Sequence, residues 1–340
     1  MTTDLNRDYR VAVLIVTHGR SERLSLTLQA LKSSDLGDIH EILVVENGAT
    51  EAQSESECLG WGGPMPIDYC AIRDSRKTRA LNVGLERTKA DFVCFLDDDV
   101  RVYEHTLATY VDAARRYGRG FFFGGPHDPE GGAPPPNWLR PFLPASAVGL
   151  SAGASEYVGD DTFLLGFNWA AFKSDIQACG GFPEYLGPNA LYPCMGDETA
   201  MQERMVAKGM HSVYLPKARS RHYVPSERCS YAFAVKRAYI GGVTKTLVDE
   251  LEGHKSRQKL PSKWRFNILA RLWFKTTVAK LSGYDKSERI ADELQKNHQL
   301  GAIVGYWVIF RHRLRFHHQE SRACQYTLTP THNLDSRNSQ

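Results

Sequence analysis

A short apolar segment that ends in three consecutive carboxylates constrains this chain more than any other feature of its sequence. Phe92 to Leu96 are apolar, and Asp97, Asp98 and Asp99 follow directly. An apolar run of this length is typical of a strand buried on both faces of a parallel sheet, and ligands bind where such strands end. Adjacent carboxylates repel one another unless a cation or several donors stabilise them. The pattern therefore predicts a divalent metal beside a phosphate group, in preference to a solvated acidic loop.

Strands and helices are expected to alternate along the first 125 residues. Apolar runs and helical spacing of leucines predict strands at 11–16, 42–45, 67–71, 91–97 and 120–124, and helices from Ser21 as the capping residue, at 78–88 and at 106–117. Such alternation is typical of a doubly wound, mostly parallel α/β sheet.

The second half of the chain is expected to be less regular. Residues 126–144, rich in Pro and Gly, are interpreted as a long loop over the sheet edge or the site. An apolar segment at 163–172, a helix at 197–208 and a short strand at 213–215 follow, then helical segments to about residue 316. Residues 327–340 are polar and are expected to be disordered.

The cysteines and the apolar runs favour a cytoplasmic protein. Seven scattered cysteines form no pair with zinc-ligand or redox spacing. The first ten residues lack the apolar stretch of a signal peptide, and no apolar run reaches the ~20 residues of a membrane span.

The charge is unevenly distributed. Residues 254–322 hold 15 Lys and Arg against 5 Asp and Glu, a surplus of +10, so a net charge of +3 leaves about −7 for the remainder. The basic region is expected either to meet an anionic surface, such as phospholipid headgroups or nucleic acid, or to be a solvated helical face. Its apolar helical faces are expected to lie in a membrane interface or to pack against the catalytic body.

Seven motifs in a fixed order carry a resemblance to a known family. Between about residues 11 and 225 the chain reads VLIVTHGR, EILVVENG, RALN, FLDDDV, GFNWAAFKS with GGFPEYL, GDETAMQERMVAKG and YLPKARSRHYVP. This order resembles the family 2 glycosyltransferases of the GT-A fold, a Rossmann-like, mostly parallel sheet flanked by helices. The resemblance implies an inverting transfer from a nucleotide sugar, with Mn²⁺ or Mg²⁺ as cofactor. We expect a GT-A domain at 8–225, a basic, aromatic helical extension at 226–322 and a disordered tail at 323–340.

Asp99 and His222 are the predicted metal ligands. Loss of a nucleoside diphosphate builds charge that a metal ion offsets, and a carboxylate with an imidazole suits Mn²⁺. In the resemblance Asp99 matches the second acid of the family's aspartate signature, and Asp97 matches the acid that faces the ribose. Asp98 lies between them and is counted with the nucleotide-sugar residues. The alternative for His222 is a surface histidine among arginines.

Five further residues are predicted on the nucleotide-sugar side. Glu46 ends its strand at the same sheet edge as the acidic strand, where it can accept hydrogens from a nucleoside. Thr17 closes the first strand and is expected near the base. Arg79 and Asn82 share a helical face, which favours a nucleotide contact over a solvated helix start. Arg20 is either a further contact or an ordinary residue at a helix start.

An acidic pair supplies the predicted general base. An inverting transfer requires a base to take the proton of the acceptor hydroxyl. Glu198 matches the base by position, but the family's usual Glu–Asp order is reversed here, so Asp197 remains an alternative. Both residues would also simply favour a helix N-terminus.

The acceptor side is predicted from a turn and a tryptophan. Gly181 and Phe182 resemble the family's acceptor-side turn. Trp169 is a candidate wall of the sugar pocket, with buried packing as its alternative role.

The leading interpretation is a cytoplasmic, metal-dependent inverting glycosyltransferase, peripheral at the inner face of a membrane if the basic region docks there. A UDP-sugar is the default donor, and the acceptor is a hydroxyl of a glycan or a lipid-linked saccharide; nucleic acid is not expected as a partner. A sugar-1-phosphate nucleotidyltransferase is one alternative, but residues 17–22 lack its Gly-rich basic loop. A degenerate glycan-binding module is the other, and it would be expected to have lost some of these acids.

Overall fold

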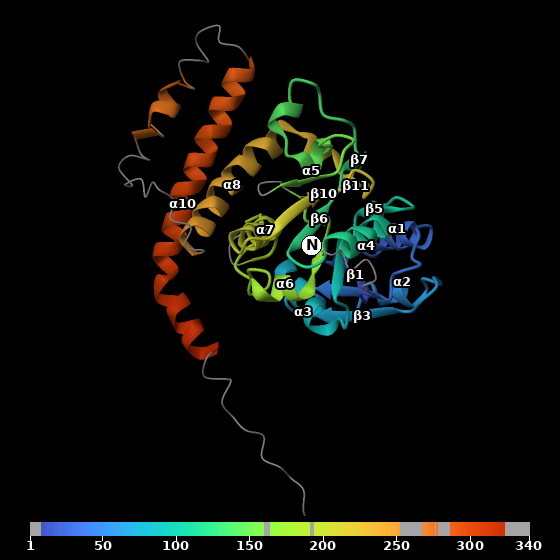
Figure 1. The fold of residues 1–340 in the computed structure, drawn as a ribbon. Coiled ribbons are helices and arrows are strands. Elements are labelled where there is room, and N and C mark those ends of the chain that lie inside the picture. The colour runs from blue at the N-terminus through green and yellow to red at the C-terminus, as the bar shows by residue number, and fades with distance from the viewer. Residues whose placement is uncertain are drawn as a thin grey trace, which may run out of the picture.

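The computed structural model describes residues 8–159, 164–190, 194–251, 267–268, 270–275, 277 and 286–323, with side chains to residue 309. An eight-stranded sheet forms its centre (Figure 1), in the order β3-β2-β1-β4-β9-β6-β10-β8. Its strands are β1 (Val11–Thr17), β2 (Glu41–Asn47), β3 (Ile67–Ile72), β4 (Phe92–Asp97), β6 (Phe121–Gly124), β8 (Tyr157–Gly159), β9 (Asn168–Phe172) and β10 (His211–Tyr214).

The sheet is mostly parallel, as the sequence predicts. Strands β1 to β4 pair in parallel, as do β6 and β10, whereas β9 runs antiparallel between β4 and β6, and β8 runs antiparallel at the edge. The register pairs Thr17 with Glu46 and Val16 with Asp97. The expectation that these strand ends meet at one edge is therefore confirmed.

Each face of the sheet is covered by helices. One face buries Val11, Val13 and Ile15 of β1 against α1 and α4, and the other buries Ala12, Leu14 and Val16 against α3, α6 and α7. Because both faces are covered, the strands are almost continuously apolar. The helices are α1 (Ser21–Lys32), α2 (Glu55–Leu59), α3 (Lys77–Arg87), α4 (Thr106–Tyr117), α5 (Ala145–Val148), α6 (Lys173–Ala178), α7 (Asp197–Ala207), α8 (Tyr231–Leu251) and α10 (Lys286–Ala323), with short 3-10 turns at Arg140–Phe142 and Ser226–Cys229.

A second sheet was not predicted. Strands β5 (Val100–Val102), β11 (Ser220–Val224) and β7 (His127–Gly131) form it in the order β5-β11-β7. The interpretation of residues 126–144 as a loop throughout is wrong, since β7 pairs in parallel with β11. The sequence of β7, HDPEG, lacks the apolar alternation that marks a strand. The strand therefore depends on its pairing with β11, which is distant in sequence. Ser21 is also not a cap, because α1 begins at Ser21 after Arg20 and no side chain caps it.

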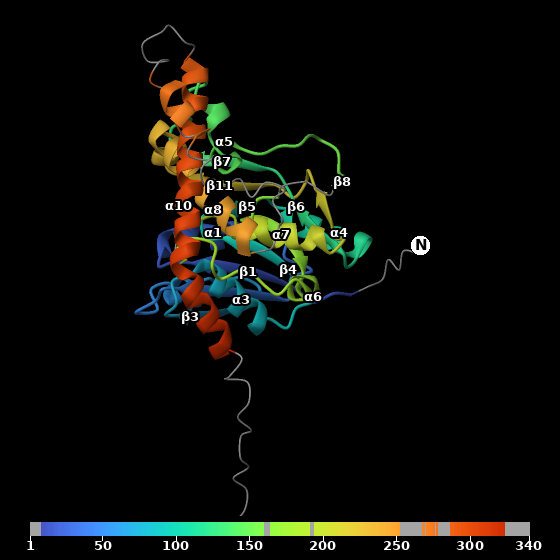
Figure 2. The same cartoon turned by 90° about the vertical axis from the view of Figure 1, so that its left-hand side faces the viewer.

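Helices α8 and α10 pack side by side at one side of the sheet body in both views (Figures 1 and 2). Their backbones approach closely at two glycines: a Cβ on Gly242 would lie 1.9 Å from the carbonyl oxygen of His298, and one on Gly301 would lie 1.9 Å from that of Tyr239. A small apolar cluster that includes Leu186 and Ala200 joins this pair to the body.

The membrane-related expectations are largely untested. None of the described helices combines the length and apolar character needed to cross a bilayer. Residues 252–266 and 278–285, most of the predicted tail and the side chains beyond residue 309 lie outside the described part of the chain. The docking of the basic region on an anionic surface, like the predicted domain division, stays a prediction.

The close approach of α8 and α10 predicts opposite effects for two adjacent glycines. Gly242→Ala should lower the free energy of unfolding by about 1–3 kcal/mol, because the new methyl group meets backbone and forces the helices apart. Gly241→Ala is the matched control: its Cβ would meet only His298 Cδ2, at 3.8 Å, and alanine favours a helix by up to ~1 kcal/mol. Urea unfolding of both variants measures the difference, and equal effects would contradict the close packing.

Candidate active site

The turn between β4 and β5 is held by Asp98, whose side chain is fully buried. Its Oδ2 accepts hydrogen bonds from Thr17 Oγ1 at 2.6 Å and from Arg20 Nε at 3.0 Å, and its Oδ1 is ion-paired with Arg20. Burial raises the pKa of Asp98 to about 6, against the opposing charge of Arg20. Thr17, Arg20 and Asp98 are thus brought together as predicted, but they bind one another and fix the acidic turn.

Asp99 and His222 meet because β11 pairs with β5. The register places His222 opposite Val100, the residue after Asp99, and the Tyr223 amide donates to the Asp99 carbonyl at 2.9 Å. His222 Nε2 lies 3.6 Å from Asp99 Oδ1, a buried oxygen with no hydrogen-bond partner in the described structure. Burial, which outweighs the nearby carboxylates, lowers the pKa of His222.

This pair fits a divalent cation. The His222 ring stacks on Phe167, with centroids 4.1 Å apart, and its Nδ1 lies 3.0 Å from the Ser146 carbonyl oxygen. A neutral ring that donates from Nδ1 leaves the Nε2 lone pair for a metal, in the usual arrangement of metal-binding histidines. No cluster of three or more His, Cys, Asp or Glu side chains suited to a metal occurs among the described residues. Other ligands would come from substrate and water.

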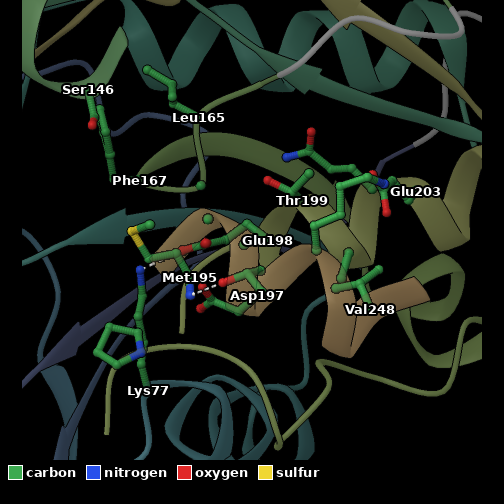
Figure 3. A pocket seen from close by; sticks show the side chains of 18 of the residues that line it. Lys77, Ser146, Leu165, Phe167, Met195, Asp197, Glu198, Thr199, Glu203 and Val248 are labelled. Atoms are coloured by element: carbon green, nitrogen blue, oxygen red, sulfur yellow. Dashed lines mark hydrogen bonds and ion pairs between the residues drawn. The ribbon is translucent and has the colours of Figure 1, made fainter. Parts of the chain in front are cut away.

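Lys77 is a central residue that the sequence analysis missed. Its ammonium lies 2.8 Å from Asp97 Oδ1. It also lies 2.6 Å from Glu198 Oε1 (Figure 3). Burial opposes its charge, but the two carboxylates outweigh burial and raise the pKa of Lys77 well above its usual range. Lys77 begins α3, the helix that follows β3, and β3 lies beside β2, which carries Glu46 near its end. This position was the signal that the sequence offered.

The surroundings of the acidic pair at the start of α7 shift the two pKa values in opposite directions. Asp197 is buried, and burial followed by the Glu198 charge raises its pKa well above the usual range. For Glu198 burial acts in the same direction, but the Lys77 charge and the hydrogen bonds with Asp197 and Lys77 together outweigh burial and lower the pKa. Glu198 is therefore the ionised member. Gly166 makes room for it, since a Cβ there would lie 2.0 Å from Glu198 Cγ.

Glu46 lies buried at the predicted edge and is held by two donors. Its Oε2 accepts hydrogen bonds from the Ser54 amide at 2.8 Å and from the Tyr69 hydroxyl at 2.6 Å. These two bonds fix the orientation of the carboxylate. It lies beside the end of β1 because Glu46 pairs in register with Thr17.

Arg79 and Asn82 share a face, but that face holds a turn. The Asn82 amide donates to the Phe182 carbonyl at 3.0 Å and accepts from the Phe182 amide at 2.9 Å. Arg79 lies 3.4 Å from Glu184 of the same segment. Gly181 has φ of 75° and faces Asn82, which leaves no room for a side chain. The contacts of this face in the structure are with residues 181–184, and its nucleotide contact stays a prediction.

The predicted aromatic wall of the acceptor pocket is also corrected. Trp169 is fully buried and stacks on Phe95, with ring centroids 4.8 Å apart. Phe182 is buried against both rings. The alternative of core packing is therefore the correct one, because β9 directs Trp169 into the layer beneath α6 and α7.

A cavity of about 960 Å³ opens beside Lys77 and Glu198. Its walls come from residues 165–167, from α7 and from one face of α8 (Figure 3). Ser146 and Phe167, which contact His222, line one part of it, and Glu203 and Val248 line another part. The cavity thus connects the surroundings of the candidate metal pair with the acidic pair and with α8.

Residues 12–178 match the model of a family described as glycosyl transferase family 2. The matched residues, which include the acidic turn, identify the chain as a member of this family. It is therefore a glycosyltransferase, an enzyme that uses nucleotide-sugar donors, and neither rival class from the sequence analysis is supported.

Two known proteins are similar over most of their length. The succinoglycan biosynthesis protein ExoM of Rhizobium meliloti (strain 1021) is 25% identical over 258 residues, which are 74% of this chain and 79% of ExoM. A mannosyltransferase from Pyrobaculum calidifontis, PcManGT, solved with GDP-Man and Mn²⁺, superposes with a TM-score of 0.57 at 16% identity, over 90% of each chain. This likeness confirms the predicted GT-A fold.

The Lys77 bridge predicts a pH-dependent loss of stability. In Lys77→Met the ammonium no longer offsets burial and the neighbouring carboxylates, so the pKa of Glu198 in the folded protein should rise above that of the unfolded chain, and the already raised pKa of Asp97 should rise further. Such groups destabilise the fold when ionised and cease to do so as they are protonated at lower pH. The variant should lose about 3–5 kcal/mol at pH 8 and clearly less at pH 5, by urea unfolding.

Arg79→Met is the control, since its ion pairs are more exposed and should contribute about 0–1 kcal/mol. A loss for Lys77→Met that does not change with pH would show that the ammonium is not paired with these carboxylates.

Proposed function

We propose that the enzyme transfers a sugar with inversion from a nucleoside diphosphate sugar, UDP-linked by default, to a hydroxyl of a glycan or lipid-linked saccharide. One observation carries the proposal: Lys77 joins Asp97, at the end of β4, to Glu198, at the start of α7, beside one cavity. The predicted metal pair adjoins the cavity through the contacts of His222 with Ser146 and Phe167, so the metal and the ionised Glu198 would face the same space. Inversion by direct displacement requires such an arrangement.

Asp99 and His222 would hold Mn²⁺ or Mg²⁺. When bound there, the metal would offset the charge of the departing diphosphate as a Lewis acid. Support comes from the buried, unpartnered Oδ1 of Asp99 and from the neutral His222 held by the Ser146 carbonyl. PcManGT, which has the same fold, was solved with Mn²⁺. Arg20 and Asp98 would keep the turn rigid and Asp99 in place.

Glu198 would be the general base. In the described state its carboxylate is ionised but is paired with Lys77, which makes it a weak base. A diphosphate that accepts hydrogen bonds from Lys77 would weaken this pair and raise the pKa of Glu198. The acceptor hydroxyl, bound in the cavity, would then give its proton to Glu198 as it attacks. Asp197, with its raised pKa, would remain protonated and support its neighbour.

The nucleoside would lie along the strand edge formed by Thr17, Glu46 and Asp97. The register of β1, β2 and β4 brings these residues to one line. Asp97 would face the ribose, and Glu46 would accept a hydrogen from the base. The name of ExoM, a succinoglycan biosynthesis protein, favours an acceptor on the path to an exopolysaccharide.

Removal of either proposed ligand should weaken metal binding without unfolding the protein. Asp99→Asn and His222→Ala should each lower metal-stimulated donor hydrolysis by ~10² fold or more, since the metal supplies several kcal/mol. Isothermal titration of Mn²⁺ into protein saturated with UDP or GDP should show the matching loss of affinity. His105→Ala, at an exposed histidine near the second sheet, is the control. Unchanged Mn²⁺ affinity in both variants would remove the metal assignment.

A second pair of variants distinguishes the roles of the two acids at the start of α7. Glu198→Gln should lower the rate of donor hydrolysis by ~10² to 10⁴ fold, the usual contribution of a positioned base, with donor affinity little changed. Asp197→Asn should lower it less, because a protonated carboxyl already resembles an amide. Single-turnover rates across a panel of nucleotide sugars give the ranking, and the reverse order would assign the base to Asp197.

A further inference from the structure

One face of α8 forms a wall of the cavity opposite the acidic pair. Arg237, Gly241, Thr244, Lys245 and Val248 recur at helical spacing and all line the cavity. Gly241 leaves this wall open, since a Cβ there would meet only one atom, at 3.8 Å. Helix α8 lies beyond residues 12–178, which match the family model. Contacts on this wall therefore belong to a part of the chain outside that match.

The guanidinium of Arg237 has no acidic partner in the described part of the chain. Its contact is a sulfur atom, with Nη1 2.8 Å from Met195 Sδ. Burial, reinforced by the charge of Arg228, lowers the pKa of Arg237. Arg237 is partly buried, and a partly buried cation without a carboxylate is unfavourable, so a binding site for an anion explains its position better than a structural role does.

Arg228 adds a second uncompensated charge. It lies in the 3-10 turn before α8, and the described residues include no ion pair with it. Its charge acts on both His222 and Arg237. Lys245, the other cation on this face, is instead paired with Asp249 at 3.1 Å. The positive field is thus concentrated at the Arg237 end of the wall.

The surroundings of Arg237 favour the acceptor over the donor as the source of the anion. Among the carboxylates of the site, Glu198 is the one whose charge raises the pKa of Arg237. The pKa of Lys77, by contrast, is raised by both Asp97 and Glu198. In the proposed function the donor diphosphate lies by the metal pair and the acceptor hydroxyl lies by Glu198. Arg237 and Glu198 line the same cavity, so we place Arg237 on the acceptor side of the site.

We propose that Arg237 anchors an anion subsite for the acceptor, which carries a phosphate or carboxylate close to its reacting hydroxyl. This inference rests on the proposed function, because it uses Glu198 to define the acceptor side. A guanidinium binds phosphate and carboxylate oxygens through two parallel hydrogen bonds, which orients the acceptor as well as attracting it.

Binding of small anions to nucleotide-loaded protein tests the subsite. Inorganic phosphate and glucuronate, each radiolabelled, are equilibrated by dialysis with full-length protein saturated with Mg²⁺ and UDP or GDP. The wild type should bind at least one of them, and the preferred probe reports whether the group is a phosphate or a carboxylate. Arg237→Gln should weaken that binding by ~10 fold or more, whereas Arg237→Lys should retain part of it.

Lys245→Gln is the matched control, because this residue lines the same face but is already paired; its anion binding should stay within about twofold of wild type. Arg237→Gln should unfold at no lower urea concentration than wild type, since it removes an unpaired, partly buried charge.

Two results would overturn the subsite: no probe binds the nucleotide-loaded wild type, or Arg237→Gln loses UDP or GDP affinity while anion binding is unchanged. The second result would assign Arg237 to the donor diphosphate. Both are binding measurements, so they are independent of donor hydrolysis, on which the proposed function depends.

Discussion

The ammonium of Lys77 between Asp97 and Glu198 is the interaction on which the arrangement of this site depends. It joins Asp97, at the end of β4, to Glu198, at the start of α7. Lys77 and Glu198 are 121 positions apart in the sequence. Without it two buried carboxylates would face each other uncompensated, which is strongly unfavourable. The same cation keeps Glu198 ionised and lowers its pKa, so one interaction acts on both the stability of the fold and the basicity of Glu198. A substrate anion that attracts Lys77 would alter both.

The two sides of the cavity are built by different kinds of structure. The donor side consists of strand ends in a sheet buried on both faces, and β11 adds His222 from the small second sheet. Such ends are positioned by the continuous hydrogen bonding of the sheet. The other side is one face of α8, held by close backbone packing with α10. This division suits an enzyme with a fixed activated donor and an acceptor particular to each family member.

Sequence reasoning predicted the parallel strands β1 to β4, β6 and β10 and the acidic turn, because apolar runs and adjacent carboxylates are local signals. It also placed Glu46 and Asp97 at one edge, since parallel strands deliver their ends together. It missed Lys77, whose partners are 20 and 121 positions away. It misassigned Trp169 to the acceptor pocket because the sequence does not reveal which face of the sheet a side chain takes. It missed β7 because the strand is polar and is specified by pairing with β11.

The stereochemistry of donor hydrolysis tests the central claim most directly, and it requires no known acceptor. Water takes the place of the acceptor beside Glu198, so a single displacement releases the sugar with its anomeric configuration opposite to that in the donor. Rapid ¹H NMR of the first turnovers, before the free sugar mutarotates, identifies the anomer. Direct displacement predicts a β-sugar from an α-linked donor. An α-sugar as the first product would contradict it and would require a different role for Glu198.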